Sequence, residues 1–219
     1  MREMLRDNLE FLRQFRQRFE TTGAVLPSSR FLARAMTGPL RGRTEPIRIL
    51  EVGPGTGAVT REIVKLVKPE DRLDLVEINE SFANMLNERF QTDRDYQRVA
   101  TQSQVHVCPL QEFRSEQPYD VIISGLPFNN FPAGLVEELV DTCFQLLAPG
   151  GTFSFFEYMY VRPVRQLVSR GAERERLRKI EETLRTRFSN HRFRRNWVFV
   201  NVPPAWVQHL RKETSGEGE

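Results

Sequence analysis

The sequence predicts an α/β fold built on buried parallel strands, and three observations lead to this prediction. Residues 47–52 are mostly apolar, as expected of a strand that is covered on both faces. Three glycines at alternate positions follow at once, and residues 59–67 then repeat apolar side chains at helical spacing. Further strand patterns occur at 73–76, 105–107 and 119–123. Strands that alternate with helical segments favour a sheet covered by helices.

The composition is that of a globular domain with basic flanks. The 219 residues fit one domain with additions, and 39% hydrophobic and 28% charged residues are ordinary values. The formal net charge is only +3, but residues 1–44 hold nine arginines against four acids. Residues 161–196 hold eleven arginines and one lysine against four glutamates. The two basic segments predict a partner that carries phosphate, either nucleic acid or an anionic membrane.

Several features limit the protein class. Cys108 and Cys143 lie in apolar segments and are predicted to be free thiols in a reducing compartment. Three scattered histidines without a Cys/His cluster predict no metal site. Glu3 and Asp7 interrupt the apolar run that a signal peptide needs, and no apolar stretch approaches the ~20 residues of a membrane-spanning helix. We therefore expect a protein that is soluble or peripherally attached to a membrane.

The glycine turn after the first strand is the candidate ligand site. Gly53, Gly55 and Gly57 let the backbone approach a ligand closely, because glycine has no Cβ. Together with Ala58 they also satisfy a loose dinucleotide fingerprint, which is weak on its own. Glu51 lies two residues before the first glycine, where a carboxylate disfavours a pyrophosphate but suits a ligand amine. The E-x-G-x-G-x-G pattern resembles the first motif of Rossmann-like methyltransferases that use S-adenosylmethionine (SAM).

The ends of the second and third strands add candidate cofactor contacts. Glu77 ends the second strand twenty residues after Gly57, where an acid can accept both ribose hydroxyls, and Ile78 follows it. The turn after the third strand is expected beside the adenine ring. Related methyltransferases often place an aspartate near Pro109, so Leu110 and Gln111 are predicted to replace it.

The turn after the fourth strand, Ser124 to Pro132, should face the transferable methyl group, since ligands bind beyond the carboxyl ends of such strands. It resembles the Asn-(Leu/Pro)-Pro-(Tyr/Phe) motif of methyltransferases that act on the adenine amine. Gly125 departs from that motif, so the backbone of residues 124–126 is left to orient an amine. Phe128 either faces an alkylated ammonium or packs in the core.

Three residues at the end of the fifth strand, predicted at 152–160, are further catalytic candidates: Glu157, Tyr158 and Tyr160. Their alternative role is packing. A helix is predicted at 136–147, and residues 193–202 with the segment after Pro204 are expected to form the closing hairpin of the sheet.

The N-terminal residues 1–20 predict an amphipathic helix whose wide apolar face is bordered by arginines. Its apolar face either packs on the core or lies in a membrane interface, and a lid over a lipid site would satisfy both. A second helix carries Phe31, Leu32 and Ala35 and is predicted to begin after Ser28 or Ser29 as N-cap.

Taken together, the motifs at 23–32, 51–57 and 124–127 resemble the small bacterial phospholipid N-methyltransferases, which are similar to rRNA adenine dimethyltransferases. The resemblance implies an α/β, Rossmann-like class I SAM methyltransferase with a mostly parallel seven-stranded sheet and N-terminal amphipathic helices. It implies methylation of phosphatidylethanolamine toward phosphatidylcholine, with S-adenosylhomocysteine as product and peripheral attachment to the cytoplasmic face of the membrane. The alternative is a nucleic-acid adenine N6-methyltransferase, although no stable nucleic-acid partner is expected.

The resemblance also divides the chain and assigns roles. Residues 1–44 form the N-terminal helices, 45–211 the methyltransferase domain and 212–219 a flexible tail. Ser29 and Ser124 join the cofactor contacts, while Ser124 and Phe128 join the catalytic set. Arg30 and Phe131 are expected to bind substrate, Arg30 through the lipid phosphate. The general base and the number of methyl groups stay open.

Overall fold

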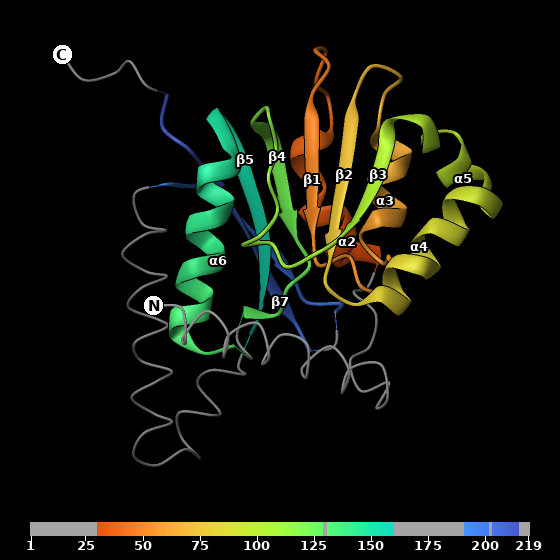
Figure 1. Ribbon diagram of the computed structural model, residues 1–219. Coiled ribbons are helices and arrows are strands. Elements are labelled where there is room, and N and C mark those ends of the chain that lie inside the picture. The colour runs from red at the N-terminus through yellow and green to blue at the C-terminus, as the bar shows by residue number, and fades with distance from the viewer. Residues whose placement is uncertain (1–29, 129–130, 160–190, 202, 215–219) are drawn as a thin grey trace.

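The computed structural model describes residues 30–128, 131–159, 191–201 and 203–214. In this part of the chain a seven-stranded sheet has the order β3-β2-β1-β4-β5-β7-β6 (Figure 1). The strands are β1 (Arg48–Val52), β2 (Arg72–Glu77), β3 (Ser103–Val107), β4 (Tyr119–Ser124), β5 (Leu147–Tyr158), β6 (Arg192–Val198) and β7 (Ala205–Arg211). The helices are α2 (Arg30–Met36), α3 (Thr60–Leu66), α4 (Glu80–Thr92), α5 (Arg94–Gln97) and α6 (Ala133–Leu146), with 3₁₀ turns at Gly38–Leu40 and Ala100–Gln102.

The direction of the strands determines where ligands can bind. β1 pairs in parallel with β2 and β4, and β3 and β5 continue the parallel sheet on either side. β7 is antiparallel to β5, and β6 is antiparallel to β7. β6 therefore runs in the same direction as β1–β5, and the carboxyl ends of these six strands lie at one edge of the sheet. We call this edge the catalytic edge.

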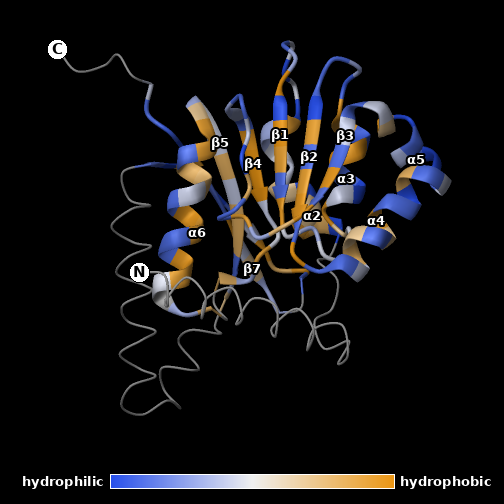
Figure 2. Cartoon of the chain, viewed as in Figure 1, coloured by the Kyte–Doolittle hydropathy of each residue, from blue (hydrophilic) through white to orange (hydrophobic). Residues whose placement is uncertain are grey.

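Two apolar layers cover the sheet. On one face, α6 packs against side chains such as Leu50 and Phe155. On the other face, α2, α3 and α4 pack against alternating residues such as Ile49 and Leu75. Figure 2 shows the apolar residues concentrated in the strands and on the sheet-facing sides of the helices. Side chains along a strand point alternately to the two faces of the sheet, so neighbouring residues of one strand belong to different layers.

The prediction of an α/β fold with a mostly parallel seven-stranded sheet and a closing hairpin is confirmed. The predicted helix at 136–147 is wrong at both ends, because α6 begins at Ala133 and Leu147 already belongs to β5. β5 extends through Pro149 because Gly150 adopts a φ of 76° and its N–H donates to Lys212 O. Lys212 was assigned to the tail, yet its Nζ donates to the carbonyls of Phe144 and Leu147 at 2.7 Å.

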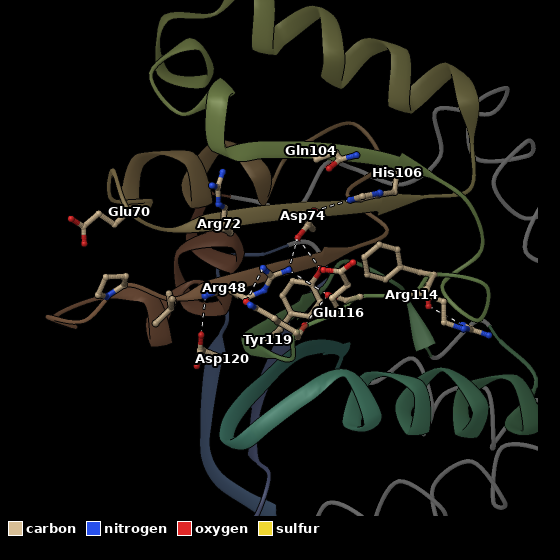
Figure 3. A pocket seen from close by; sticks show the side chains of 15 residues that line it. Arg48, Glu70, Arg72, Asp74, Gln104, His106, Arg114, Glu116, Tyr119 and Asp120 are labelled. Atoms are coloured by element: carbon tan, nitrogen blue, oxygen red, sulfur yellow. Dashed lines mark hydrogen bonds and ion pairs between the residues drawn. The ribbon is translucent and has the colours of Figure 1, made fainter.

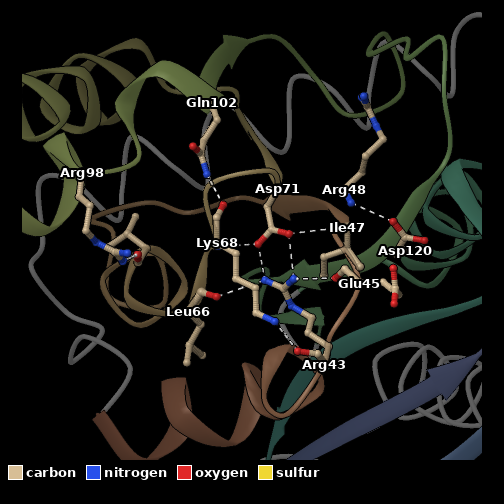
Figure 4. Close-up of polar contacts among 11 residues, drawn as sticks. Arg43, Glu45, Ile47, Arg48, Leu66, Lys68, Asp71, Arg98, Gln102 and Asp120 are labelled. Atoms are coloured by element: carbon tan, nitrogen blue, oxygen red, sulfur yellow. Dashed lines mark hydrogen bonds and ion pairs between the residues drawn. The ribbon is translucent and has the colours of Figure 1, made fainter.

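A buried ion pair closes the opposite, amino-terminal edge of the sheet (Figure 4). The two terminal guanidinium nitrogens of Arg43, Nη1 and Nη2, bind the carboxylate of Asp71, whose side chain is fully buried. Asp71 also accepts the backbone N–H groups of Ile47 and Lys68, at 2.9 and 2.6 Å. The pair thus ties the loop before β1 to the turn before β2.

The predicted helix at 1–20 and the charged segment at 162–187 lie outside the described residues. Within the described ranges, no helix has the length and apolar character needed to cross a bilayer.

Candidate active site

The glycine turn after β1 has the conformation that its sequence predicts. Gly53, Gly55 and Gly57 have φ angles of 64°, 56° and 76°, in the left-handed region that favours glycine. At Gly57 a Cβ would also come within 2.6 Å of Arg89 Nη1. The Arg89 guanidinium donates to Thr56 O at 2.6 Å, and the buried hydroxyl of Tyr96 donates to Gly57 O at 3.3 Å. Sequence reasoning missed these two supports, which reach the turn from the region of α4 and α5.

Glu77 at the end of β2 is oriented by two backbone donors. Its Oε2 accepts the N–H of Gly55 at 2.9 Å, and its Oε1 accepts the N–H of Asn79 at 3.0 Å. Asn79 in turn caps α4 by accepting the N–H of Phe82 at 3.1 Å. The fully buried carboxylate is therefore fixed against the glycine turn, and its contact with a ribose stays a prediction.

Glu51 is a buried carboxyl group beneath the same turn. Its side chain is fully buried, and neither oxygen has a hydrogen-bond partner among the described residues. Burial raises the pKa of Glu51 to about 8, and the nearby charge of Glu77 adds to the increase. Thr60 lowers the pKa of Glu51 and so offsets part of the increase. The Thr60 hydroxyl is itself buried and has no hydrogen-bond partner in the described chain. Such a group is neutral at pH 7 unless a cation is bound beside it.

The carboxyl ends of β1, β2 and β3 enclose a small cavity. Four predicted cofactor residues line it together: Gly53, Glu77, Ile78 and Leu110. Its remaining walls are mostly apolar and come from Val52, Val76, Cys108, Pro109, Leu126 and Leu139. Beside it, both polar atoms of the Gln111 amide are buried and have no hydrogen-bond partner in the described chain. With a volume of about 30 Å³ the cavity is an apolar corner of the catalytic edge that includes one acid, and it is too small to enclose a nucleoside by itself.

The turn after β4 is held tightly against the glycine turn. The N–H of Gly125 donates to Val52 O at 2.8 Å, and the buried Ser124 Oγ accepts the N–H of Leu126 at 3.3 Å. A Cβ at position 125 would lie only 2.6 Å from the carbonyl oxygen of Gly53. The departure from the adenine motif therefore has a structural reason, because any side chain at position 125 would collide with the glycine turn.

The two aromatic candidates after this turn lie in the core. Phe128 and Phe131 are fully buried, and the Phe128 ring centroid lies 5.5 Å from that of Phe155. The alternative interpretation of Phe128, core packing, is the one that the structure shows. A role of either ring against substrate stays a prediction.

Glu157 and Tyr158 leave opposite faces of β5, because they are neighbours in one strand. Glu157 shares its face with Phe155, and its Oε2 accepts from Gln208 Nε2 at 3.1 Å. Tyr158 packs edge-on against Phe156 on the other face, and burial raises its pKa. Both residues lie at the end of β5, as predicted, but on opposite faces of the sheet, and their roles stay a prediction. Gln208 was missed, since nothing in the local sequence distinguishes it.

Arg30 is exposed at the start of α2, where its guanidinium carbon lies 4.9 Å from the ring centroid of Phe31. Ser29 and Tyr160 fall outside the described residues. No cluster of three or more metal-binding side chains occurs in the part of the chain that the structure describes.

A larger hollow of about 640 Å³ lies near the amino ends of β1, β2 and β4 (Figure 3). At its centre Asp74 binds His106 Nε2 at 2.7 Å and accepts from the Tyr119 hydroxyl at 2.8 Å. Burial raises the pKa of Tyr119 to about 12, Asp74 adds to the increase, and Ser115 and Arg48 oppose it. The three central groups, Asp74, His106 and Tyr119, bind one another, and ligands of such sheets bind at the other, carboxyl-terminal edge. This hollow is therefore not the cofactor site.

Several known proteins are similar to this chain in sequence or in fold. A family model described as a methyltransferase domain matches residues 50–153. The ornithine lipid N-methyltransferase of Singulisphaera acidiphila is 31% identical over 150 residues, which cover 68% of this chain and 77% of that protein. The malonyl-[acyl-carrier protein] O-methyltransferase of Bacillus cereus is 33% identical over 115 residues, 51% of this chain and 38% of that protein. Among solved structures, the N-methyltransferase NodS from Bradyrhizobium japonicum WM9 in complex with S-adenosylhomocysteine has a TM-score of 0.60 at 16% identity, covering 90% of this chain and 97% of that one.

The fold, the glycine turn and the family model together define the class as Rossmann-like methyltransferases that use SAM. The 31% identical relative, most of which the chain covers, shows that the chain belongs to this SAM-dependent methyltransferase family.

The residues present fit SAM. The buried carboxyl of Glu51 has no hydrogen-bond partner among the described residues, and the ammonium group at the methionyl end of SAM would supply one. The buried amide of Gln111 has no partner there either, and the edge of an adenine ring would offer both a donor and an acceptor. Glu77, Ile78 and Leu110 line the small cavity at the same edge of the sheet.

Proposed function

We propose that this methyltransferase transfers methyl groups to the primary amine of a lipid head group, with phosphatidylethanolamine as substrate, at the cytoplasmic surface of the membrane. The observation that carries the lipid class is the relative that is 31% identical over most of its own length and is named an ornithine lipid N-methyltransferase. Ornithine contains amines and a carboxylate but no phosphate. The phosphatidylethanolamine assignment rests on the motif resemblance and on the arginines of the chain.

The geometry after β4 supports an amine acceptor other than adenine. Position 125 holds no side chain and has no room for one, so the amide that would read the adenine amine is absent from its expected place. The backbone from Ser124 to Leu126 is held rigidly at the catalytic edge and can orient an aliphatic amine. SAM supplies an electrophilic methyl group on its sulfonium, and the protein mainly aligns the acceptor and excludes water.

An ethanolamine ammonium must lose a proton before it can attack. Glu157 is our candidate for the accepting group, because its carboxylate is buried, lies at the catalytic edge and shares a face with Phe155. Gln208 Nε2 holds the orientation of Glu157 Oε2. Repeated methylation makes the head group more apolar and bulkier, which suits the aromatic surroundings of this face.

The test is methyl transfer from radiolabelled SAM to three acceptors: vesicles with phosphatidylethanolamine, vesicles with ornithine lipid, and protein-free rRNA that lacks adenine dimethylation. Label in phosphatidylethanolamine supports the proposal, and chromatography of the products counts the methyl groups. Label in ornithine lipid alone would keep the lipid class and reject the phospholipid. Label in RNA alone would reject the proposal in favour of the adenine enzyme.

A further inference from the structure

A group of exposed apolar side chains lies at the β6 edge of the sheet. Phe31, Trp197, Phe199 and Val200 are 42%, 56%, 63% and 64% exposed. With Arg194 and Arg195 they line one open hollow between α2 and the end of β6. We call these six residues the β6 surface. Large apolar side chains that gather with this exposure typically mark an interaction site.

The β6 surface also carries positive charge, and one of its arginines lies over aromatic rings. Arg194 and Arg195 are both exposed, and three of the four residues from 192 to 195 are arginines. The Arg195 guanidinium carbon lies 4.4 Å from the ring centroid of Trp206 and 6.0 Å from that of Trp197. Residues 191–213 contain five basic side chains and one acid. The partner should therefore combine an apolar layer with negative charge.

The β6 surface lies at the catalytic edge. β6 runs in the same direction as β1–β5, so Val198 and the following Phe199 and Val200 are at the edge that carries the glycine turn. The hairpin after β6 is held in place, because Asn201 Nδ2 donates to Pro203 O and Met159 N donates to Pro204 O, both at 2.7 Å. The end of β6 is separated from the end of β5 by one strand, because Val198 pairs with Ala205 of β7 and Ala205 pairs with Tyr158.

Two partners could cover the β6 surface: a second copy of this chain or an anionic bilayer. A second copy could pair along β6, which ends the strand order among the described residues, but Arg192, Arg194 and Arg195 of each copy would then approach one another, and like charges across strands are destabilising. An anionic bilayer instead supplies opposite charge to the arginines and an interfacial layer that tryptophan and phenylalanine favour. The charge pattern thus favours lipid.

We propose that the β6 surface docks the enzyme on an anionic bilayer, with Trp197, Phe199 and Val200 at the level of the lipid head groups. This inference deepens the proposed function, on which it rests, because it explains how the catalytic edge would meet a substrate that stays in the membrane. It also assigns a membrane contact that is separate from the amphipathic helix predicted at 1–20.

The first test uses the two tryptophans of the chain. W206F keeps Trp197, and W197F removes it. Each full-length variant is mixed with vesicles of phosphatidylglycerol and phosphatidylcholine, which carry no primary amine. In W206F the emission should shift to shorter wavelength and be quenched by brominated lipids, whereas W197F should respond weakly. A protein that sediments with the vesicles while the emission of Trp197 is unchanged would overturn the inference, since docking would then occur elsewhere.

The second test measures vesicle affinity. F199S/V200S should bind the same vesicles at least about tenfold more weakly, and R194E about tenfold more weakly. The matched controls are V107S and R72E, which change exposed residues of β3 and β2, at the opposite end of the strand order from β6, and should bind like the unchanged protein. Methyl transfer to phosphatidylethanolamine dispersed in detergent should stay unchanged in F199S/V200S.

The outcomes separate the two proposals. Docking of Trp197 without methyl transfer to any lipid would reject the proposed function and keep the β6 surface. Lipid methylation with equal vesicle affinity in all variants would keep the function and reject the surface. A dimer that R194E changes, with no response of Trp197 to vesicles, would identify a second copy as the occupant and overturn the proposal.

Discussion

At the scale of single residues, Glu51 is the group whose charge SAM should change. Its pKa of about 8, raised by burial above the ordinary 4.5, leaves the carboxyl about nine-tenths protonated at pH 7. The amine of SAM favours the ionised form, so binding should release close to one proton. Calorimetry at pH 7 in phosphate and in Tris, which differ in ionisation enthalpy, should give different observed enthalpies.

The release of this proton also determines how SAM affinity changes with pH. Because the proton must leave, SAM affinity should increase from about pH 6 to pH 7.5, by up to tenfold per unit. E51Q should abolish the proton release and flatten the pH dependence while weakening binding. Equal enthalpies in the two buffers would show that Glu51 does not face the amine.

Glu77 supports a second prediction. E77A should weaken SAM binding by ~1.5–3 kcal/mol, about 10- to 150-fold, because it removes a charged acceptor and releases the N–H of Gly55. The matched control is E80Q, which removes an exposed charge at the start of α4 and should leave affinity unchanged. SAM affinity of E77A equal to that of the unchanged protein, by calorimetry, would place the ribose contact elsewhere.

At the scale of structural elements, the contact between the β1 and β4 turns yields a third prediction. G125A should lower both SAM affinity and the free energy of unfolding, the latter by ~1–3 kcal/mol, because its Cβ would come within 2.6 Å of Gly53 O. G134A is the matched control, since its Cβ in α6 would meet no atom within 4 Å. Urea unfolding and SAM titration of both variants check this. A G125A protein with unchanged values would mean that the two turns are not rigidly coupled.

The elements predicted correctly are those that depend on local pattern. The strand before Gly53, the acid at Glu77 and the closing hairpin follow from short-range periodicity and glycine spacing. The requirement for glycine at 125 could not be predicted, because it comes from a carbonyl seventy-two residues away in sequence. Arg89 and Tyr96 were missed for the same reason. The separation of Glu157 from Tyr158 was predictable, since adjacent strand residues always face opposite sides.

At the scale of the whole molecule, the Arg43–Asp71 pair should contribute strongly to stability. R43M should lower the free energy of unfolding by ~3 kcal/mol, because it leaves a buried carboxylate without its cation. R41M, which changes an exposed arginine of the same loop, should have little effect. Chemical unfolding at pH 7 measures both, and equal stabilities would show that the pair is replaceable.

The pH dependence of global stability should have two windows. Burial alone would raise the pKa of Asp71, but the hydrogen bonds from Arg43, Lys68 and Ile47 outweigh it and lower the pKa below the ordinary 3.8. A depressed carboxyl pKa contributes stability that is present above the ordinary pKa and is lost as the pH falls below it. Asp71 should therefore stabilise the fold fully at neutral pH, and the loss of this stability should appear only below about pH 4, in strongly acidic solution.

His209 should govern the milder window. Its Nδ1 pairs with Ser154 Oγ at 2.8 Å in the interior between β5 and β7, and burial, with a smaller effect of Arg194, lowers its pKa from 6.5 to about 4. The unfolded chain takes up a proton there first, so stability should fall as the pH decreases from about 6.5 toward 4, by at most ~1.4 kcal/mol per unit. Urea midpoints at pH 7, 6 and 5 should decrease steeply in the unchanged protein and less steeply in H209Q. Parallel curves for the two proteins would assign the acid sensitivity to another group, and the sheet interior would then tolerate a charged His209.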